Sequence, residues 1–220
     1  YYPRLTEVIH DKVAAVQLMN DQAQLGLAIG GPVLLLLIGL APWVITLLYS
    51  SAFEPAVTLL QWQMVGNVFK LASWAMSFSI VAAARGKTFF LMELSGNIVF
   101  LSMVFVFLPR VGLEVTAYAF VLGYLVYLTI VYVLARSIHG FRWQALSLGL
   151  LGLHTSLGLA LLVLALIAPL AAAMASPLLA AATGLFGLRV VLSKVGKHGR
   201  LPTRLYGIFA KLGWPIQSAI

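Results

Sequence analysis

Long apolar stretches alternate with short polar connections along the whole chain. Each stretch is close to or longer than the roughly 20 residues that an α-helix needs to cross the hydrocarbon core of a membrane. A β-barrel would instead show polar and apolar residues alternating in segments of about ten. The pattern therefore predicts an all-α integral membrane protein, a polytopic helical bundle of about six transmembrane helices, at residues 25–49, 56–84, 88–108, 113–135, 145–168 and 172–192.

The composition points to lipid as the solvent and removes several functional classes. Of the 220 residues, 62% are hydrophobic and 9% are charged, whereas soluble domains carry roughly 25% charged residues. The chain has no cysteine, which excludes disulfides and thiolate metal sites. It has no HExxH or GxSxG motif, and Val81 stands where a phosphate-binding loop through Gly86 would need its first glycine. We expect no enzyme activity, no catalytic residue, no metal and no cofactor.

The basic residues lie on alternate connections between the apolar stretches. A net charge of +8 could suit nucleic acid, but this placement is typical of membrane orientation, so we expect no nucleic-acid partner. Positive residues mark the cytoplasmic side of a membrane protein, and Arg110 alone lies on the opposite side. Both termini are therefore predicted to be cytoplasmic, on the side of Arg4, Lys12, Arg85, Lys87, Arg136, Arg142, Arg189, Lys194, Lys197, Arg200, Arg204 and Lys211.

The two ends of the chain differ from the six apolar stretches. Residues 1–24 mix charged and apolar positions and are predicted to form a cytoplasmic interfacial segment before the transmembrane domain, residues 25–192. Residues 193–220 are predicted to form a basic cytoplasmic tail. Part of the tail suits a short helix lying on an anionic membrane surface, with a disordered tail as the alternative. The apolar positions at helical spacing there are Leu205, Ile208, Leu212 and Trp214.

A polar stripe on the second predicted span contains a lysine near the middle of the membrane. Gln63, Asn67, Lys70 and Ser77 are spaced so that they share one helix face. A lysine at the bilayer centre costs about 2.5–3.5 kcal/mol even on the lenient insertion scale. This polar stripe therefore indicates either a substrate-binding, cationic wall of a cavity that takes an anionic substrate, or a structural polar contact inside the bundle.

Glu93 and Asn97 form a smaller polar pair, four residues apart, on the third predicted span. They are candidates for ion coupling, because burial raises the pKa of a carboxylate. Alternatively, Glu93 lies near the lipid headgroups. The axial offset from Lys70 is about 13 Å, so we do not expect a direct ion pair between Glu93 and Lys70.

Several other residues leave two interpretations open. The tyrosines of the fourth predicted span could contact a sugar or serve packing and interface anchoring. His154, a lone histidine in the fifth predicted span, could relay protons or make a structural hydrogen bond. The tyrosines are Tyr118, Tyr124, Tyr127 and Tyr132.

Motifs within roughly the first 140 residues resemble those of Wzx-type O-antigen and lipid-linked oligosaccharide flippases, in the superfamily that includes the MATE exporters. They include the opening Tyr1–Glu7, Ala41–Ile45, Leu60–Trp62 with Gly66 and Lys70, Ser73–Trp74, and Ala84–Lys87 with Phe90 and Glu93.

This resemblance implies a protein that moves an undecaprenyl-diphosphate-linked oligosaccharide, such as an O-antigen repeat unit of lipopolysaccharide, across the bacterial inner membrane by alternating access. Lys70 would face the diphosphate or an acidic sugar, and Glu93 would be a polar residue of the C-terminal lobe. The chain corresponds to that lobe and its extra helices. The implied partners are membrane lipid, the lipid-linked oligosaccharide, a missing N-terminal lobe or partner chain, and a polysaccharide polymerase.

Two other functions fit the sequence. A MATE-type small-molecule antiporter is the first, although the deep charge is positive. A non-transporting membrane subunit of a polysaccharide assembly complex is the second.

Overall fold

The chain folds into a set of long helices joined by short connections. The structure, a computed structural model, describes residues 2–49, 51–196, 200–211 and 213–216. Six helices are long and apolar enough to cross a membrane, which confirms the predicted all-α, multi-pass membrane architecture. The elements are α1 (Tyr2–Val8), α2 (Lys12–Leu48), the 3₁₀ turn η1 (Ser51–Phe53), α3 (Ala56–Ala82), α4 (Gly86–Val111), α5 (Glu114–His139), α6 (Ala145–Ile167), α7 (Pro169–Val195) and α8 (Arg200–Lys211).

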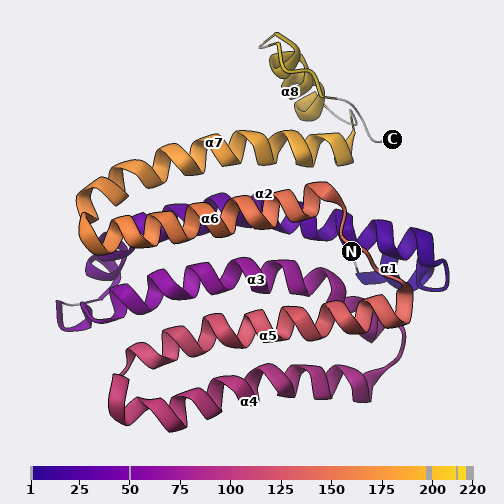
Figure 1. Ribbon diagram of the computed structural model, residues 1–220. Coiled ribbons are helices and arrows are strands. Elements are labelled where there is room, and N and C mark those ends of the chain that lie inside the picture. The colour runs from indigo at the N-terminus through magenta and orange to yellow at the C-terminus, as the bar shows by residue number, and fades with distance from the viewer. Residues whose placement is uncertain (1, 50, 197–199, 212, 217–220) are drawn as a thin grey trace.

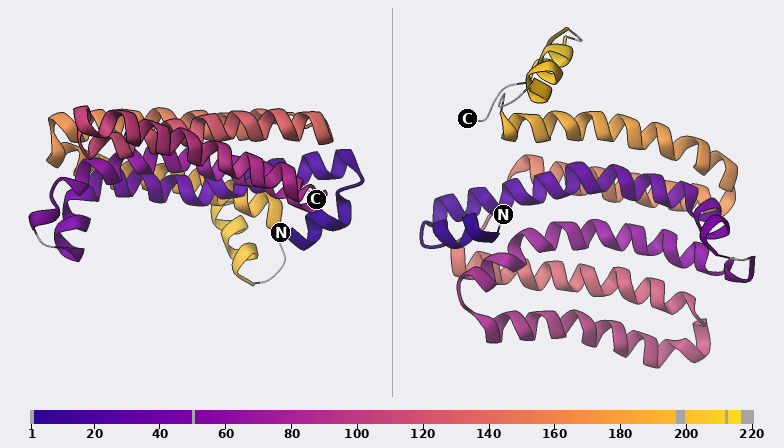
Figure 2. Two further views of the ribbon diagram at one scale, coloured as in Figure 1. Left: turned by 90° about the horizontal axis from the view of Figure 1, so that it is seen from below. Right: turned by 180° about the vertical axis from the view of Figure 1, so that it is seen from behind.

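The six long helices form a flattened bundle whose order in space differs from their order in the chain. Figure 1 shows α7 at one edge, then α2 with α6, then α3, α5 and finally α4 at the other edge. The α2 helix is central and packs on α3, α6 and α7, whereas α4 packs mainly on α5. The views in Figure 2 show the same flattened arrangement from below and from behind. Met92 is the only fully buried residue of α4.

The α2 helix is one continuous helix of 37 residues. It begins at Lys12 because the Asp11 carboxylate accepts hydrogen bonds from the backbone N–H groups of Val13 and Ala14, at 3.0 and 3.1 Å. Residues 1–24, predicted to be a separate interfacial segment, therefore comprise α1 and the first turns of the same helix that contains the first predicted span. Tyr1 lies outside the described residues.

Prolines mark both a turn and the interiors of helices. Pro169 is the first residue of α7, so the turn between α6 and α7 lies at Ala168, and Pro177 lies inside α7. Pro42 lies inside α2 and cannot donate to the Ile38 carbonyl one turn earlier. The Gln61 side chain of α3 donates to that carbonyl at 3.1 Å. A freed carbonyl in the membrane is thus satisfied by a neighbouring helix.

Small residues bring α7 close against α2. A Cβ atom added to Gly187 would lie 2.2 Å from the Ala28 carbonyl oxygen, and one added to Gly39 would lie 2.3 Å from the Ser176 hydroxyl. Such close approach of backbones is a common basis for helix association in lipid.

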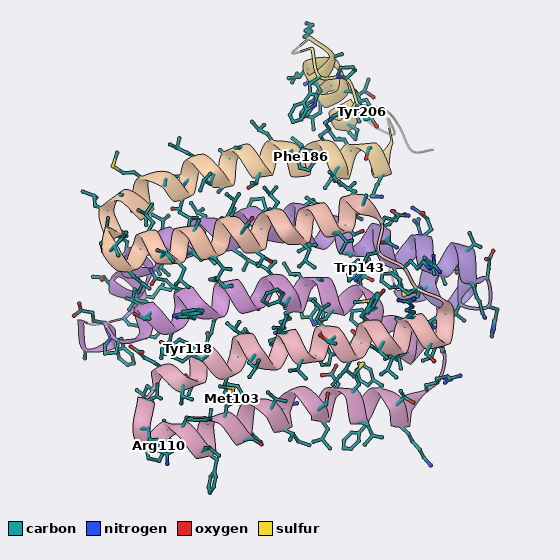
Figure 3. All side chains as sticks on the ribbon, in the orientation of Figure 1. Met103, Arg110, Tyr118, Trp143, Phe186 and Tyr206 are labelled. Atoms are coloured by element: carbon teal, nitrogen blue, oxygen red, sulfur yellow. The ribbon has the colours of Figure 1, made fainter. Side chains whose placement is uncertain are left out.

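The ends of the helices separate the charges as the sequence predicts. Figure 3 shows Arg110 and Trp143 at opposite ends of the bundle. The starts of α2 and α6 and the ends of α3, α5 and α7 lie at the Trp143 end (Figure 1). Arg85, Arg142 and Lys194 therefore share one end of the bundle, away from Arg110.

The tail contains a short helix, α8, within the predicted basic segment. Its Tyr206 and Phe209 are buried and pack against Leu192 at the end of α7. Ile208 stays exposed, together with the basic Arg204 and Lys211. Placement of α8 on a membrane surface stays a prediction. Leu212 and the tail residues 197–199 and 217–220 lie outside the described residues.

Candidate substrate site

The four residues of the polar stripe on α3 have different surroundings along the helix. Gln63, Asn67 and Lys70 are half-buried, and Ser77 is buried. Asn67 and Lys70 line a surface groove between α3 and Ile29–Leu34 of α2. The Ser77 hydroxyl donates to the Trp74 carbonyl at 3.1 Å. The predicted set is thus on one helix face, but only Asn67 and Lys70 border the same groove.

The Lys70 ammonium group lies over two aromatic rings. Its Nζ is 5.4 Å from the ring centroid of Trp74 on α3 and 5.3 Å from that of Tyr124 on α5. The ring faces carry partial negative charge, and such contacts contribute about 0.5–2 kcal/mol each. Within the described ranges, the one ion pair is Lys194 with Asp21. Lys70 is therefore a cation held by aromatic rings and not neutralised by a carboxylate.

A second hollow lies beside the same two rings, between α3, α4 and α5. We call it the α3–α4 groove; it has a volume of about 240 Å³. It exists because α3 and α4 both pack on α5 but barely touch each other. The lining residues are Trp74 from α3; Glu93, Gly96, Asn97 and Phe100 from α4; and Ala119, Phe120, Gly123, Tyr124 and Tyr127 from α5.

Small residues give the α3–α4 groove its depth. A Cβ atom added to Gly123 would lie 3.3 Å from the Gly96 carbonyl oxygen, so α4 and α5 cross with their backbones close together. Aromatic side chains then stand up around this close crossing. The floor is therefore backbone and small side chains, and the walls are largely aromatic.

Glu93 and Asn97 bring the polar groups of the α3–α4 groove. Tyr127 of α5 donates a hydrogen bond to the Glu93 carboxylate, and the Ser77 side chain interacts with the same tyrosine. The Asn97 amide nitrogen donates to the Glu93 backbone carbonyl at 2.8 Å. The two candidate coupling residues thus lie on one groove, where Trp74 and Tyr124 connect them to Lys70.

Sequence reasoning did not place Trp74 and the glycines at this site, and it left the tyrosines open between sugar contact and packing. Trp74 was named only as part of a motif and not as a site residue, and Gly96 and Gly123 carry no polar signal inside an apolar span. Two of the four tyrosines, Tyr124 and Tyr127, line the α3–α4 groove. Tyr118 instead packs edge-on against Trp62.

A buried polar network at the Trp143 end was also missed. Asn20, Gln24 and Ser147 are buried. The Asn20 side-chain oxygen accepts from the Gln144 backbone N–H at 2.9 Å and from the Ser147 hydroxyl at 2.8 Å, and its nitrogen donates to the Arg142 carbonyl at 3.0 Å. Gln24 donates to Ser147 at 3.0 Å. The spacing of Asn20 and Gln24 on one helix face was the available signal. The network joins α2 to the start of α6, and its members use their hydrogen-bonding groups on one another.

His154 lies in the helix packing, outside both grooves. Its Nδ1 is 2.9 Å from the Leu150 carbonyl oxygen. A Cβ atom added to Gly31 would lie 2.3 Å from the imidazole, so the ring fills the space above that glycine. This geometry favours the structural interpretation of His154.

The comparisons with known proteins leave the site to be interpreted from its own geometry. No family model, no curated protein and no solved structure matches the chain. The resemblance to lipid-linked oligosaccharide flippases stays a prediction.

Proposed function

We propose that this chain is the C-terminal lobe of a flippase that moves an undecaprenyl-diphosphate-linked oligosaccharide across the bacterial inner membrane, with both termini in the cytoplasm. Lys70 is the observation that carries the proposal. It lies far from either end of a membrane-spanning helix, over two rings, without a carboxylate partner. An ammonium group kept at that depth is available to an anion.

A diphosphate supplies the missing anion. Moving an isolated phosphate through hydrocarbon is very unfavourable unless a cation and hydrogen-bond donors meet it. Lys70 is half-buried and borders a surface groove with Asn67, so a phosphate could approach both side chains. The Coulomb attraction between the Lys70 ammonium and a phosphate is stronger inside the membrane than in water.

The remaining parts of the substrate also find suitable surfaces. Aromatic rings pack well on the apolar faces of sugar rings, and Trp74 is 45% exposed beside Lys70. The basic residues gather at the Trp143 end of the bundle, which supports a cytoplasmic location for that end. Alternating access would require a second lobe or partner chain facing this one.

Deletion of the gene tests the proposal. Lipid-linked repeat units should accumulate and surface polysaccharide should be lost. A plasmid with Lys70→Met should fail to restore export at normal protein levels, because the variant keeps the size of the side chain and removes its charge. Lys87→Met, at the exposed start of α4, is the matched control and should restore export. Unchanged precursor and surface glycan after deletion would contradict the proposal.

A second candidate function is an antiporter that exports organic cations in exchange for an ion. The Glu93 carboxylate in an aromatic groove favours it, because such surroundings suit cationic ligands. Overexpression should then give resistance to a cationic dye such as ethidium, and Glu93→Gln should remove that resistance. Equal sensitivity with and without the protein would leave only the flippase proposal.

A further inference from the structure

Resting on the proposed function, we infer that the α3–α4 groove is a sugar subsite beside the diphosphate position, and that it accepts a neutral or N-acetylated sugar and rejects a uronic acid. The two grooves share Trp74, which lines both. A ligand with an anion at Lys70 can therefore place its next group against Trp74 in the α3–α4 groove.

The size of the α3–α4 groove limits its occupant. Pockets for drug-sized ligands measure roughly 300–1,000 Å³, and this groove measures about 240 Å³. The close approach of the Gly123 Cβ position to the Gly96 carbonyl oxygen, 3.3 Å, means that backbone closes the floor of the groove. The groove thus suits one ring, with the rest of an oligosaccharide outside.

The chemistry of the walls matches a sugar ring. Trp74 and Tyr124 line the groove, and aromatic rings suit the apolar C–H face of a sugar. The Glu93 carboxylate has acceptor positions beyond the one used by Tyr127, because a carboxylate has about four lone-pair sites. The Asn97 nitrogen is turned to its own helix, which leaves its oxygen to accept from a ligand. Sugar hydroxyls are the donors that these acceptors require.

The same carboxylate decides the selectivity. A uronic acid would bring a second carboxylate close to Glu93, and like charges at short distance repel each other. An organic cation is also disfavoured, because it would be repelled by the Lys70 ammonium that lies over Trp74 and Tyr124. A neutral sugar avoids both conflicts.

Binding to the whole chain in phospholipid nanodiscs tests the inference with three probes. These are farnesyl diphosphate, farnesyl diphosphate bearing N-acetylglucosamine, and farnesyl diphosphate bearing glucuronic acid. We expect the N-acetylglucosamine probe to bind about tenfold more tightly than bare farnesyl diphosphate, since ring packing and hydrogen bonds add to the phosphate contact. The glucuronic acid probe should bind no more tightly than the bare diphosphate. Lys70→Met should weaken all three.

Two variants assign the gain to the groove. Trp74→Ala should remove the tenfold gain, so that in this variant the N-acetylglucosamine probe binds no more tightly than the bare diphosphate. Trp74→Phe should keep part of the gain, which excludes misfolding as the cause. Trp43→Ala is the matched control, because Trp43 is 46% exposed on α2 and outside the groove. Glu93→Gln should let the glucuronic acid probe bind more tightly, whereas Glu114→Gln, which also removes a tyrosine-bound carboxylate, should not.

The outcomes separate the inference from the proposed function. If bare diphosphate binds through Lys70 but the sugar adds nothing, or if glucuronic acid binds as well as N-acetylglucosamine, the sugar subsite is overturned and the flippase proposal stands. If no probe binds to the folded chain, both are overturned. Ethidium binding that depends on Trp74 and Glu93 would also overturn the subsite and favour the antiporter.

Discussion

Polar side chains serve opposite purposes in the two halves of this molecule. In the half built from α2, α6 and α7, Asn20, Gln24 and Ser147 are buried and satisfy one another. In the half built from α3, α4 and α5, Lys70 lies over aromatic rings and Glu93 faces a groove. The comparison teaches that the partners of a polar residue in a membrane, more than its presence, distinguish a structural contact from a candidate ligand site. Substitutions in each half can break or sharpen this contrast.

Gly187→Ala should have the largest effect on folding. The added methyl would lie 2.2 Å from the Ala28 carbonyl oxygen, and backbone atoms cannot rotate away as a side chain can. Overpacking costs typically about 1–3 kcal/mol, and we expect the upper end here. Thermal unfolding in detergent measures the change. Gly184→Ala, whose methyl would meet Pro32 at 3.8 Å, should leave stability unchanged or raise it, and equal losses in both variants would contradict this account of the α2–α7 contact.

Asn20→Leu should have the second-largest effect on stability. It removes the hydrogen bonds to Arg142, Gln144 and Ser147. Only Ser147 is buried, whereas Arg142 is exposed and Gln144 half-buried, so water can replace part of the loss and we expect a cost of about 1–2 kcal/mol. The same substitution at Asn67, whose amide donates to the Gln63 carbonyl in its own helix, should change stability by less than about 0.5 kcal/mol. Chemical denaturation of both variants measures the difference. Similar losses would mean that the two halves do not differ in the way described.

Gln61→Leu should cost about 1 kcal/mol, because the Ile38 carbonyl loses the donor that replaces the missing N–H of Pro42. Adding Pro42→Ala should recover most of this loss, since alanine restores the helix's own hydrogen bond. A double-mutant cycle measures the coupling between the two positions. Additive effects would show that Gln61 does not act through that carbonyl.

Lys70→Met should have the smallest effect on stability. Loss of the cation–π contacts is offset by removal of a charge from the apolar interior, so the melting temperature should stay within about 1 °C, equivalent to about 0.5 kcal/mol or less. Parallel melting of the wild type and the variant checks this. A large drop would make Lys70 a structural residue and would weaken the flippase proposal.

The sequence predicted the helices well because membrane spans can be recognised from their length and hydropathy alone. Identifying the six spans needed no knowledge of packing. The periodicity of α3 placed Lys70 and Ser77 on one face, but it could not say that α2 covers one part of that face and α5 another. Trp74, Gly96 and Gly123 were missed for a related reason. Their role depends on which helices meet at them, and apolar residues give no sign of that within a span.

The α2 helix is continuous and longer than a membrane span needs to be. Its 37 residues give about 55 Å of helix, roughly 25 Å more than the hydrocarbon core of a bilayer. The additional length includes the first turns of α2, which are bonded to the start of α6 through Asn20 and to α7 through the Asp21–Lys194 ion pair. Pro32 and Pro42 lie further along the same helix, where it can bend. Because these first turns and the groove wall at Ile29–Leu34 belong to one continuous helix, a tilt of the turns also changes the width of the groove beside Lys70.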